Sequence, residues 1–453
     1  MIEIKNIDPT VIQLMNDETV ELAMKLTEYQ CEFWQQTGRG KVRKTYNKNF
    51  VSGSRRLGWF LYAGFKNRVK EYCEIKCIEF REMGEELRLE PVREPYLKGI
   101  EPRPIQLEAI KAIHKHQRGI ISMATGSGKT LTIALLLSTY KNPKCLFICR
   151  SLDLALQAHQ VFTSHGFKSC LIGGGAKEIT APIVCGTIQT YLSLHNIHRS
   201  SYFDIICYDE CHNGSSVGGQ MEKLLPTLLC PVRIGLSATP PTEPANFLLL
   251  NGLFGDTLLN ASTSYGIEEG FLSTPKIVLL PVPENKSLRD VKTYVMMRKL
   301  GIVENPIRNA IIAKTVKKEI EEGRSCLVFC IELDHITKLS KLFNEMGILH
   351  NSAFGEVSSE DREIIKNDLD SKKNLVVISS NVFCAGIDVK SLDSIILGCG
   401  GKSEENLIQR IGRALRVTDE KNTATIFDLL DSSKFLSGHT VSRLAVYVKN
   451  GWL

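Results

Sequence analysis

Two adjacent carboxylates at the end of an apolar run are the first candidates for chemistry in this sequence. The stretch FDIICYDECHNG, residues 203–214, places Asp209 and Glu210 directly before Cys211 and His212. Two kinds of site use such residues: a metal centre built from Cys, His and carboxylate ligands, or the magnesium-holding end of a strand that serves a nucleotide. The rest of the sequence has to decide between them.

A glycine-rich stretch upstream has the context of a phosphate-binding loop. SMATGSGKT, ending at Thr130, follows the apolar run GIISM and precedes the helix-period run LTIALLLSTY. Backbone N–H groups and a helix N-terminus together supply positive potential at such a turn. Gly126 and Gly128 permit the tight path, Lys129 reaches the β and γ phosphates, and the Thr130 hydroxyl ligates magnesium. The strict eight-residue pattern has glycine where this chain has Met123.

The loop gives the two carboxylates a function. A nucleoside triphosphatase of this kind needs an acid on a neighbouring strand for magnesium and a second group that orients the attacking water. We therefore expect Asp209 to hold magnesium together with Thr130, and Glu210 to orient the water. Cys211 and His212 then need no metal. The cofactors predicted from these residues are ATP and Mg²⁺, and no zinc is expected.

Composition is that of a globular protein with two or three domains. The chain has 453 residues, 43% of them apolar, and a net charge of +6. It has no run of about eighteen apolar residues and its start lacks a signal-peptide layout, so a soluble, cytoplasmic protein with no membrane partner is expected. The fourteen cysteines are widely spread, and none has the two-residue spacing of a zinc knuckle. Three pairs four apart read as core thiols on one face of a strand: Cys145 and Cys149, Cys207 and Cys211, Cys326 and Cys330.

Strand and helix patterns alternate through most of the chain. Apolar runs separated by helix-period segments predict parallel sheets flanked by helices, in two tandem α/β domains at 99–281 and 282–453. The segment between about 281 and 306 is predicted to hold a linker and a helix. The strand candidates are GIISM, CLFIC, CLIGG, PIVCG, DIICY and RIGLS in the first block, and CLVFC, LVVISS, SIILG and ATIFDLL in the second.

Residues 1–98 have a different sequence pattern from the rest of the chain, and we expect a small, basic N-terminal α+β domain. From Phe33 through Lys70 there is no Asp or Glu but there are ten Lys or Arg residues, interleaved with aromatics such as Tyr46, Phe50 and Trp59. Such a stretch favours a surface that grips nucleic-acid phosphates. The alternative is a solvated basic face whose aromatics are simply the core of the domain. The candidate DNA-binding residues are Arg39, Lys41, Arg43, Lys44, Arg55 and Arg56.

With ATGSGKT and DECH in place, the chain resembles the superfamily 2 helicases, and further motifs follow in that family's order over roughly residues 100–430. They are RPIQLEAI, RSLDLALQ, GTIQT, SAT, SSNVFCAGIDV and QRIGRALR. The resemblance implies two RecA-like domains of the P-loop NTPase type. It implies that Gln106 reads adenine and that His212, Ser237 and Thr239 couple hydrolysis to movement. RSLDLALQ departs from the family pattern because it lacks the usual Pro-Thr.

The resemblance also implies the remaining site residues. We expect catalysis to involve Gln409, Arg413 and Arg416, with the two arginines three apart on one helix face and neutralising charge on the γ-phosphate when the two domains close. Nucleotide binding is expected from Gln106, Thr125, Gly126, Ser127, Gly128, Lys129, Thr130 and Asp388. Contacts to the DNA backbone are expected from Arg150, Gly174, Thr187, Gln189 and Ser380.

Within the superfamily, the layout is similar to the UvsW group of phage recombination helicases. Gln409 stands where DEAD-box proteins have histidine, and the acidic motif is DECH. The resemblance implies an ATP-dependent 3′-to-5′ DNA helicase that migrates branches and remodels forks and Holliday junctions in recombination, repair or replication. Branched DNA, and recombination or replication proteins, are the partners that it implies. If phage-encoded, the protein would work in the host cytoplasm.

Other classes of function share parts of this pattern. A double-stranded DNA translocase or an RNA or R-loop helicase without junction specificity would share the same motor. A restriction-type translocase needs a nuclease module, for which EIK at residues 74–76 is a poor match. A non-catalytic nucleic-acid-binding protein is disfavoured because Lys129, Asp209 and Glu210 are intact, and a kinase or GTPase would not carry the second block with its arginine motif.

Overall fold

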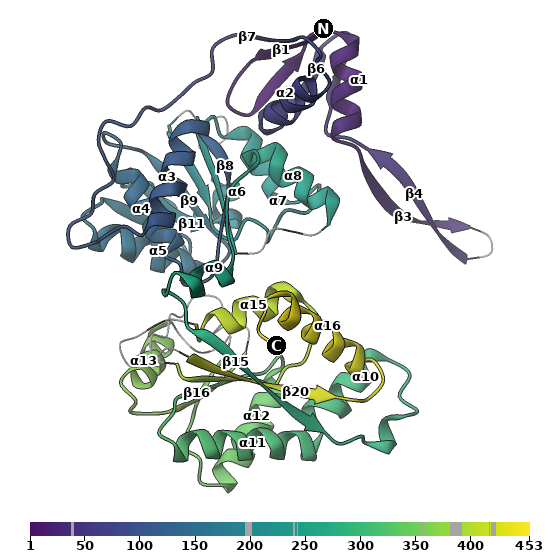
Figure 1. Ribbon diagram of the computed structural model, residues 1–453, viewed down its shortest axis with the longest axis vertical. Coiled ribbons are helices and arrows are strands. Elements are labelled where there is room, and N and C mark those ends of the chain that lie inside the picture. The colour runs from purple at the N-terminus through teal and green to yellow at the C-terminus, as the bar shows by residue number, and fades with distance from the viewer. Residues whose placement is uncertain are drawn as a thin grey trace. The chain divides into compact units, whose positions relative to one another are not determined.

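The computed structural model separates the chain into two compact units (Figure 1). One comprises Met1–Met123 and Gly128–Asn260, and the other Ala124–Ser127 and Ala261–Leu453. The residues described are 1–37, 40–194, 202–238, 241, 243–354, 357, 359–380, 392–415, 417 and 423–453. Within these ranges no helix has both the length and the apolar character needed to cross a membrane.

The first unit contains a seven-stranded sheet in the order β10-β11-β9-β12-β13-β8-β14. The pairs from β10 through β8 are parallel. All six predicted strands are confirmed. Strands buried on both faces read as continuous apolar runs, which makes them predictable. Their bounds are β8 Arg118–Met123, β9 Cys145–Cys149, β10 Ser169–Ile172, β11 Ile183–Thr187, β12 Ile205–Tyr208 and β13 Val232–Ser237. Strand β14, Thr257–Ala261, lies at the sheet edge, is only partly buried, and was not predicted.

Helices connect these strands as parallel pairing requires. The helix predicted after the glycine-rich turn is α4, Lys129–Ser138. The cysteine pairs predicted as core thiols are all buried, and burial raises the pKa of the Cys145 and Cys207 thiols well above the ordinary value. The other helices of this unit's sheet domain are α3 Pro104–His116, α5 Leu152–Ser164, α6 Ile188–Ser193, α7 Gln220–Leu224 and α8 Pro244–Phe254.

The N-terminal region is an α+β domain, as predicted. Its mixed sheet has the order β5-β6-β2-β1-β7, with helices α1 and α2 beside it and a two-stranded ribbon, β3-β4, extending away from it (Figure 1). The strands are β1 Ile2–Asn6, β2 Val11–Leu14, β3 Tyr29–Thr37, β4 Gly40–Lys48, β5 Ser52–Ser54, β6 Gly58–Tyr62 and β7 Phe80–Met83. The helices are α1 Asp17–Leu26, the 3-10 turn η1 Ala63–Phe65 and α2 Lys66–Ile75.

This N-terminal domain packs closely on α8 of the first unit. A Cβ atom added to Gly64 in η1 would lie 2.1 Å from the Asn251 carbonyl oxygen and 2.5 Å from that of Gly252. A Cβ added to Gly252 would lie 2.7 Å from a ring carbon of Phe65. Two glycines therefore allow the backbones to approach to a distance that a side chain would prevent. The Tyr62 hydroxyl adds a 3.2 Å hydrogen bond to Glu222.

The second unit contains a six-stranded sheet in the order β15-β20-β19-β16-β18-β17, with parallel pairing throughout. The four strands predicted for this block are confirmed. β15 lies on the N-terminal side of the predicted domain boundary at 281/282 yet pairs along its whole length with β20 in the second sheet. The strands are β15 Thr274–Val282, β16 Cys326–Phe329, β17 Asn351–Ala353, β18 Val376–Ser379, β19 Ser394–Leu397 and β20 Thr423–Asp431.

The helix predicted between the two blocks is α10, Tyr294–Arg298, which continues into the π-helical turn η4, Lys299–Val303. Buried ion pairs tie the elements of this unit together: Arg308 donates to Asp431 and Arg443 donates to Asp428. The remaining helices are α9 Thr263–Glu268, α11 Pro306–Glu321, α12 Leu333–Glu345, α13 Ser359–Asp370, α15 Glu404–Gly412 and α16 Leu436–Lys449.

Candidate nucleotide and nucleic-acid site

The glycine-rich loop forms the turn between β8 and α4. Gly126 and Gly128 both have φ near 86°, in the left-handed region that favours glycine, and Gly128 is the N-cap residue of α4. The turn delivers Lys129 and Thr130 as the first two residues of the helix, as the sequence predicted. The four N–H groups at a helix start have no partner within the helix, so this end of α4 can accept an anion.

Lys129 and Glu210 form an ion pair. The Lys129 Nζ lies 2.8 Å from the Glu210 Oε1, and the side chains are 10% and 17% exposed. Glu210 itself has φ near 52°, a conformation uncommon for a residue with a side chain. The structure therefore brings together the lysine of the glycine-rich loop and the second carboxylate of the acidic motif.

Asp209 follows β12 and is 9% exposed. Burial and the neighbouring Glu210 charge raise its pKa to about 6, although Lys129 acts in the opposite direction. A buried carboxylate whose charge is opposed in this way is well suited to a cation, because a cation would stabilise the ionised form. The Asp209 carboxylate is thus suited to the magnesium role predicted for it, and magnesium binding by Asp209 and Thr130 stays a prediction.

His212 links the acidic motif to the end of β13. Its Nδ1 lies 2.8 Å from the Ser237 Oγ and 3.5 Å from the Glu210 Oε2. Its Nε2 lies 2.7 Å from the Asn213 Nδ2. Since an amide nitrogen can only donate, Nε2 is the acceptor, and Nδ1 carries the proton that it donates toward Ser237. His212 is 8% exposed and its two ring nitrogens are fully used by protein groups.

Asn213 is a candidate that the sequence analysis missed. Its side-chain nitrogen donates to His212, and its Oδ1 accepts from the Arg150 Nη1 at 3.4 Å. A continuous path of contacts therefore runs from Lys129 to Arg150: the Lys129–Glu210 ion pair, the 3.5 Å contact of Glu210 with His212, and the hydrogen bonds of Asn213 with His212 and Arg150. The asparagine directly after DECH was the available signal, but nothing in its local sequence identifies the strand end that it contacts.

Gln106 lies beside the loop and is 1% exposed. Its Oε1 accepts from the Arg103 backbone N–H at 3.0 Å, and its Nε2 lies 3.5 Å from the Gly128 carbonyl oxygen. A Cβ atom on Gly128 would approach that Nε2 to 2.8 Å. The contact of α3 with the loop is established by these atoms, whereas adenine reading by Gln106 stays a prediction.

The predicted DNA-contact residues of the first unit follow neighbouring strands. Gly174 follows β10, Thr187 ends β11 and Arg150 follows β9, and these three strands are adjacent and parallel. Carboxyl ends of parallel strands meet at one sheet edge, and the next strand ends along that edge carry Asp209 and Ser237. Arg150, Gly174 and the α6 residue Gln189 are exposed, and Thr187 caps α6 through its hydroxyl.

The second unit carries the remaining motor candidates. Gln409 lies in α15, and Ser380 directly follows β18. The prediction that one helix carries both arginines is wrong for Arg413, because α15 ends at Gly412 and Arg413 is its C-cap residue. Arg413 keeps helical backbone angles and the Ala414 N–H bonds to the Ile411 carbonyl at 2.9 Å, while the Leu415 carbonyl accepts from the Ser273 N–H at 2.6 Å. The candidates Arg416, Asp388, Thr239 and Arg39 lie outside the described residues.

The N-terminal basic candidates divide between the ribbon and the sheet. Lys44 is exposed on β4, and Arg55 and Arg56 are exposed in the turn after β5. Lys41 and Arg43 belong to β4, but their side chains are outside the described part of the chain. Phe50 and Phe65 are buried and their rings lie 5.7 Å apart, so these aromatics form core, as the alternative interpretation held. Tyr46 is 40% exposed and packs beneath the Lys48 ammonium.

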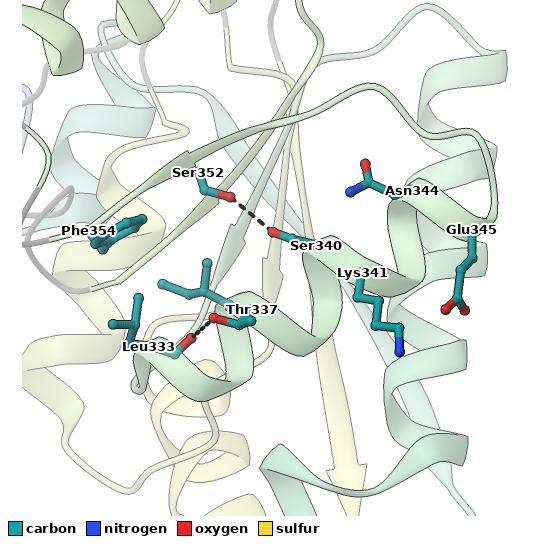
Figure 2. A pocket seen from close by; sticks show the side chains of 9 residues that line it. Leu333, Thr337, Ser340, Lys341, Asn344, Glu345, Ser352 and Phe354 are labelled. Atoms are coloured by element: carbon teal, nitrogen blue, oxygen red, sulfur yellow. Dashed lines mark hydrogen bonds between the residues drawn. The ribbon is translucent and has the colours of Figure 1, made fainter.

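A separate cavity of about 520 Å³ lies in the second unit between α12 and β17 (Figure 2). Leu333, Ile336 and Phe354 line it, and the Ser340 and Ser352 hydroxyls, 3.1 Å apart, use each other as partners. Apolar walls of this kind do not fit a triphosphate.

Among the side chains that the structure describes, no group of three or more His, Cys, Asp or Glu is placed to hold a metal ion.

Comparison with known proteins agrees with this arrangement. The family model described as the Type III restriction enzyme, res subunit, matches residues 99–242, and the helicase conserved C-terminal domain matches residues 308–418. The ATP-dependent DNA helicase uvsW of Enterobacteria phage T4 is 31% identical over 356 residues, which cover 74% of this chain and 70% of that protein. The DNA 3'-5' translocase XPB2 of Sulfurisphaera tokodaii is 25% identical over 398 residues, 79% of this chain and 88% of that protein.

Similarity to a solved structure supports the fold and nothing beyond the fold. Dbp5 of S. cerevisiae, bound to RNA and ADP BeF3, matches with a TM-score of 0.55 at 17% sequence identity, over 78% of this chain and 92% of that one. The prediction of two tandem RecA-like α/β domains with parallel sheets is confirmed by this likeness and by the two sheets described above.

Proposed function

Since this chain belongs to the superfamily 2 ATP-dependent DNA helicases, as a relative of T4 UvsW, we propose that it remodels branched DNA, migrating Holliday junctions and regressing forks with 3′-to-5′ polarity. The observation that carries the proposal is the close packing of the basic N-terminal domain on α8 through Gly64 and Gly252. A junction enzyme must hold one DNA arm while it moves along another. A basic domain fixed to the first motor sheet is suited to hold that arm.

We propose that hydrolysis uses the residues around the glycine-rich loop. Thr130 and Asp209 would hold Mg²⁺, which offsets the negative charge of the phosphates. Lys129 binds the β and γ phosphates after it leaves Glu210, and Glu210, released from that ion pair, accepts a hydrogen bond from the attacking water. Thr125, Gly126, Ser127 and Gly128 surround the phosphates through the loop, and Gln106 reads adenine beside it.

Residues of the second block complete the proposed reaction. Arg413 and Arg416 neutralise charge on the γ-phosphate, an effect worth roughly 10³–10⁵ in rate in related nucleotide enzymes, and Gln409 and Asp388 assist at the nucleotide. His212, Ser237 and Thr239 couple hydrolysis to movement. Closing and reopening of the motor with each ATP then steps a grip on one strand, made by Arg150, Gly174, Thr187, Gln189 and Ser380.

The N-terminal DNA grip is proposed on the ribbon and the neighbouring turn. Its residues are Arg39, Lys41, Arg43, Lys44, Arg55 and Arg56. Support comes from the exposure of Lys44, Arg55 and Arg56 and from the absence of carboxylates between residues 33 and 70. The proposed domains are 1–98, 99–281 and 282–453, with β15 at the end of the middle segment joining the second sheet. Recombination or replication proteins are the proposed partners.

The test compares substrates with one enzyme preparation. ATP hydrolysis and strand separation are measured on Holliday junctions, forks, simple duplexes and RNA, beside Glu210→Gln as the inactive control. We expect junctions and forks to stimulate hydrolysis more than duplex, with branch migration as the product. Equal stimulation by unbranched duplex would favour a double-stranded DNA translocase, stimulation by RNA alone would end the recombination proposal, and binding without turnover would indicate a non-catalytic protein.

A second experiment addresses the grip. Lys44→Ala combined with Arg55→Ala and Arg56→Ala removes three exposed charges without touching the core. We expect weaker junction binding at low salt and a smaller salt slope, with basal ATP hydrolysis within about twofold of the parent. The matched control replaces three exposed lysines of the second unit, Lys317, Lys341 and Lys373. Junction binding that fell equally in both variants would argue against a specific grip.

A further inference from the structure

Two arginines lie side by side in the first sheet, at the start of their strands. Arg118 opens β8 and pairs with Arg233 of β13, and their exposed fractions are 8% and 1%. Burying two like charges together costs free energy unless each finds acceptors or a counter-charge. The two guanidinium groups differ in how many hydrogen-bond acceptors they have.

Arg233 is saturated by backbone carbonyl groups. Its Nε, Nη1 and Nη2 donate at 3.0, 2.7 and 2.9 Å to the carbonyl oxygens of Leu253, Leu228 and Leu225. Arg118 donates from Nη2 to the Pro9 carbonyl at 2.7 Å, but its buried Nε has no hydrogen-bond partner among the described residues. Burial and the Arg233 charge lower the pKa of Arg118 to about 10. The Glu86 and Asp8 charges act in the opposite direction, but no acceptor meets the Arg118 Nε.

Arg118 also lines a polar cavity of about 200 Å³ at the contact between the N-terminal domain and the first sheet. We call it the Arg118 cavity. Cationic side chains of α2, α3 and the segment before α3 share its wall with Arg118: Lys66, Lys70, Arg88 and Lys115. Its volume equals that of roughly six or seven waters, which is room for one phosphate group and part of its hydration shell.

The carboxylates of the cavity do not balance these charges. Glu82 and Glu86 line the wall, and an oxygen of each lies 3.0 Å from the Lys66 ammonium. Glu82 also accepts from the Asn6 amide and lies near the Lys70 charge, and Glu86 lies near the Arg118 charge, so two carboxylates face five cationic side chains of the wall. Lys70 and Lys115 line the cavity and are exposed, and neither forms an ion pair within the described part of the chain. A cluster with buried and exposed cations in excess of its acids is complementary to a multiply charged anion.

We propose that the Arg118 cavity binds a phosphate group. Phosphate offers several acceptor oxygens and more than one negative charge, so one group can accept from the Arg118 guanidinium where it lines the cavity and be neutralised by the exposed Lys70 and Lys115 ammonium groups. The cavity is separate from the nucleotide loop, because Arg118 begins β8 and the loop follows its other end. The inference does not depend on junction preference.

Two sources can present the same chemistry: a phosphodiester of bound DNA, or free inorganic phosphate or pyrophosphate. A DNA phosphate held here would contact the N-terminal domain through α2 and the first sheet through β8 at once. Free phosphate would instead stabilise the packing of these two parts. The experiment has one arm that detects phosphate at the cavity and one that separates the sources.

The first arm uses the full chain and inorganic phosphate at constant ionic strength, with chloride as the comparison. Lys70→Ala with Lys115→Ala removes the two exposed cations of the wall, and the matched control, outside the wall, is Lys76→Ala at the C-cap of α2 with Lys111→Ala in α3. His116 lines the cavity, and burial together with the Lys115 and Arg88 charges lowers its pKa. Its imidazole signal in nuclear magnetic resonance therefore reports phosphate locally, without interference from phosphate at the nucleotide loop.

In the parent and in the control we expect phosphate to shift the His116 signal and raise the His116 pKa. The Lys70 and Lys115 variant should need at least tenfold more phosphate for the same shift. Equal titrations in the two double variants, or no shift of the His116 signal in the parent, would overturn the proposal.

The second arm measures the salt dependence of duplex DNA binding in the same variants. Each lost phosphate contact lowers the slope of log affinity against log salt by about 0.9. A slope that falls by about one to two in the Lys70 and Lys115 variant, but not in the control, identifies a DNA phosphodiester as the occupant. Equal slopes in the two variants, with the difference in phosphate titration preserved, identify free phosphate.

Discussion

The Lys129 ammonium lies 2.8 Å from the Glu210 carboxylate, so two residues with separate proposed tasks in ATP hydrolysis neutralise each other. A γ-phosphate that binds Lys129 competes directly with Glu210 for the same charge. Because His212 lies 3.5 Å from the other Glu210 oxygen, the displaced carboxylate remains next to the group that contacts Ser237. In the proposed mechanism, binding of the triphosphate and activation of the water are therefore linked through one side chain.

Glu210→Gln tests this competition. Loss of the carboxylate should lower single-turnover hydrolysis by roughly 10²–10⁴, the range for general-base groups. ATP affinity should stay equal or increase severalfold, because Lys129 no longer has to leave a charged partner. Fluorescent nucleotide binding and single-turnover assays measure the two effects, with Glu108→Gln, an exposed glutamate of α3, as the control. Tenfold weaker ATP binding in Glu210→Gln would contradict the competition.

Asn213 is predicted to transmit nucleic-acid binding to the nucleotide site, because it bonds both His212 and Arg150. Asn213→Leu removes two hydrogen bonds, each worth about 0.5–1.5 kcal/mol. We expect DNA stimulation of ATP hydrolysis to fall about tenfold while basal hydrolysis changes little. Asn213→Asp keeps an oxygen for Arg150 and loses the donor to His212, so an intermediate effect is expected. An equal loss of basal and stimulated rates would indicate that Asn213 stabilises the loop and does not transmit DNA binding.

Gly64 and Gly252 should be intolerant of side chains. Alanine at either position meets backbone oxygen or an aromatic ring below 3.0 Å, and overpacking of this kind costs about 1–3 kcal/mol. We expect faster proteolysis between residues 84 and 103 and a loss of any preference for branched DNA, with basal hydrolysis retained. Gly438→Ala, which would meet nothing within 4 Å, is the control and should leave proteolysis unchanged.

His335 should make the second unit sensitive to acid. Burial, together with the nearby Arg308 and Lys338 charges, lowers its pKa to about 3 from the ordinary 6.5, although Asp334 acts in the opposite direction. The unfolded chain therefore binds a proton at a higher pH than the folded chain does. Stability is complete above about pH 6.5 and is lost as pH falls toward 3, by up to about 1.4 kcal/mol per pH unit.

Hydrogen exchange of α12 and β16 at pH 7.5 and 5.5 measures this loss, after correction for the intrinsic rates. His335→Gln can still donate to the Asn309 oxygen, which lies 3.0 Å from the His335 Nε2, but it does not titrate. The difference between the two pH values should shrink in this variant. An equal pH response in the parent and in His335→Gln would mean that other groups control it.

The buried strands were predictable because parallel strands covered on both faces need continuous apolar runs. Strands with polar positions were not. β14 and β15 mix exposed, partly buried and buried residues without regular alternation, and their assignment depends on the neighbour with which they pair. β15 pairs with β20, about 150 residues later, so no local pattern could assign it to the second sheet. The predicted arginine helix extends past the end of α15 at Gly412. The Leu415 carbonyl accepts from the Ser273 N–H, and no local pattern shows this contact with a distant segment.

The sequence alone determined the phosphate loop, the acidic pair and the family, because glycine, lysine and carboxylate at fixed spacing on a strand–turn–helix have few other uses. Tertiary structure decided which groups meet. The Glu210 partner of Lys129, the link from His212 through Asn213 to Arg150, and the Arg118 cavity all join residues from different strands or domains. Those contacts depend on strand order and on the close approach of two glycines, and both are properties of the packed chain.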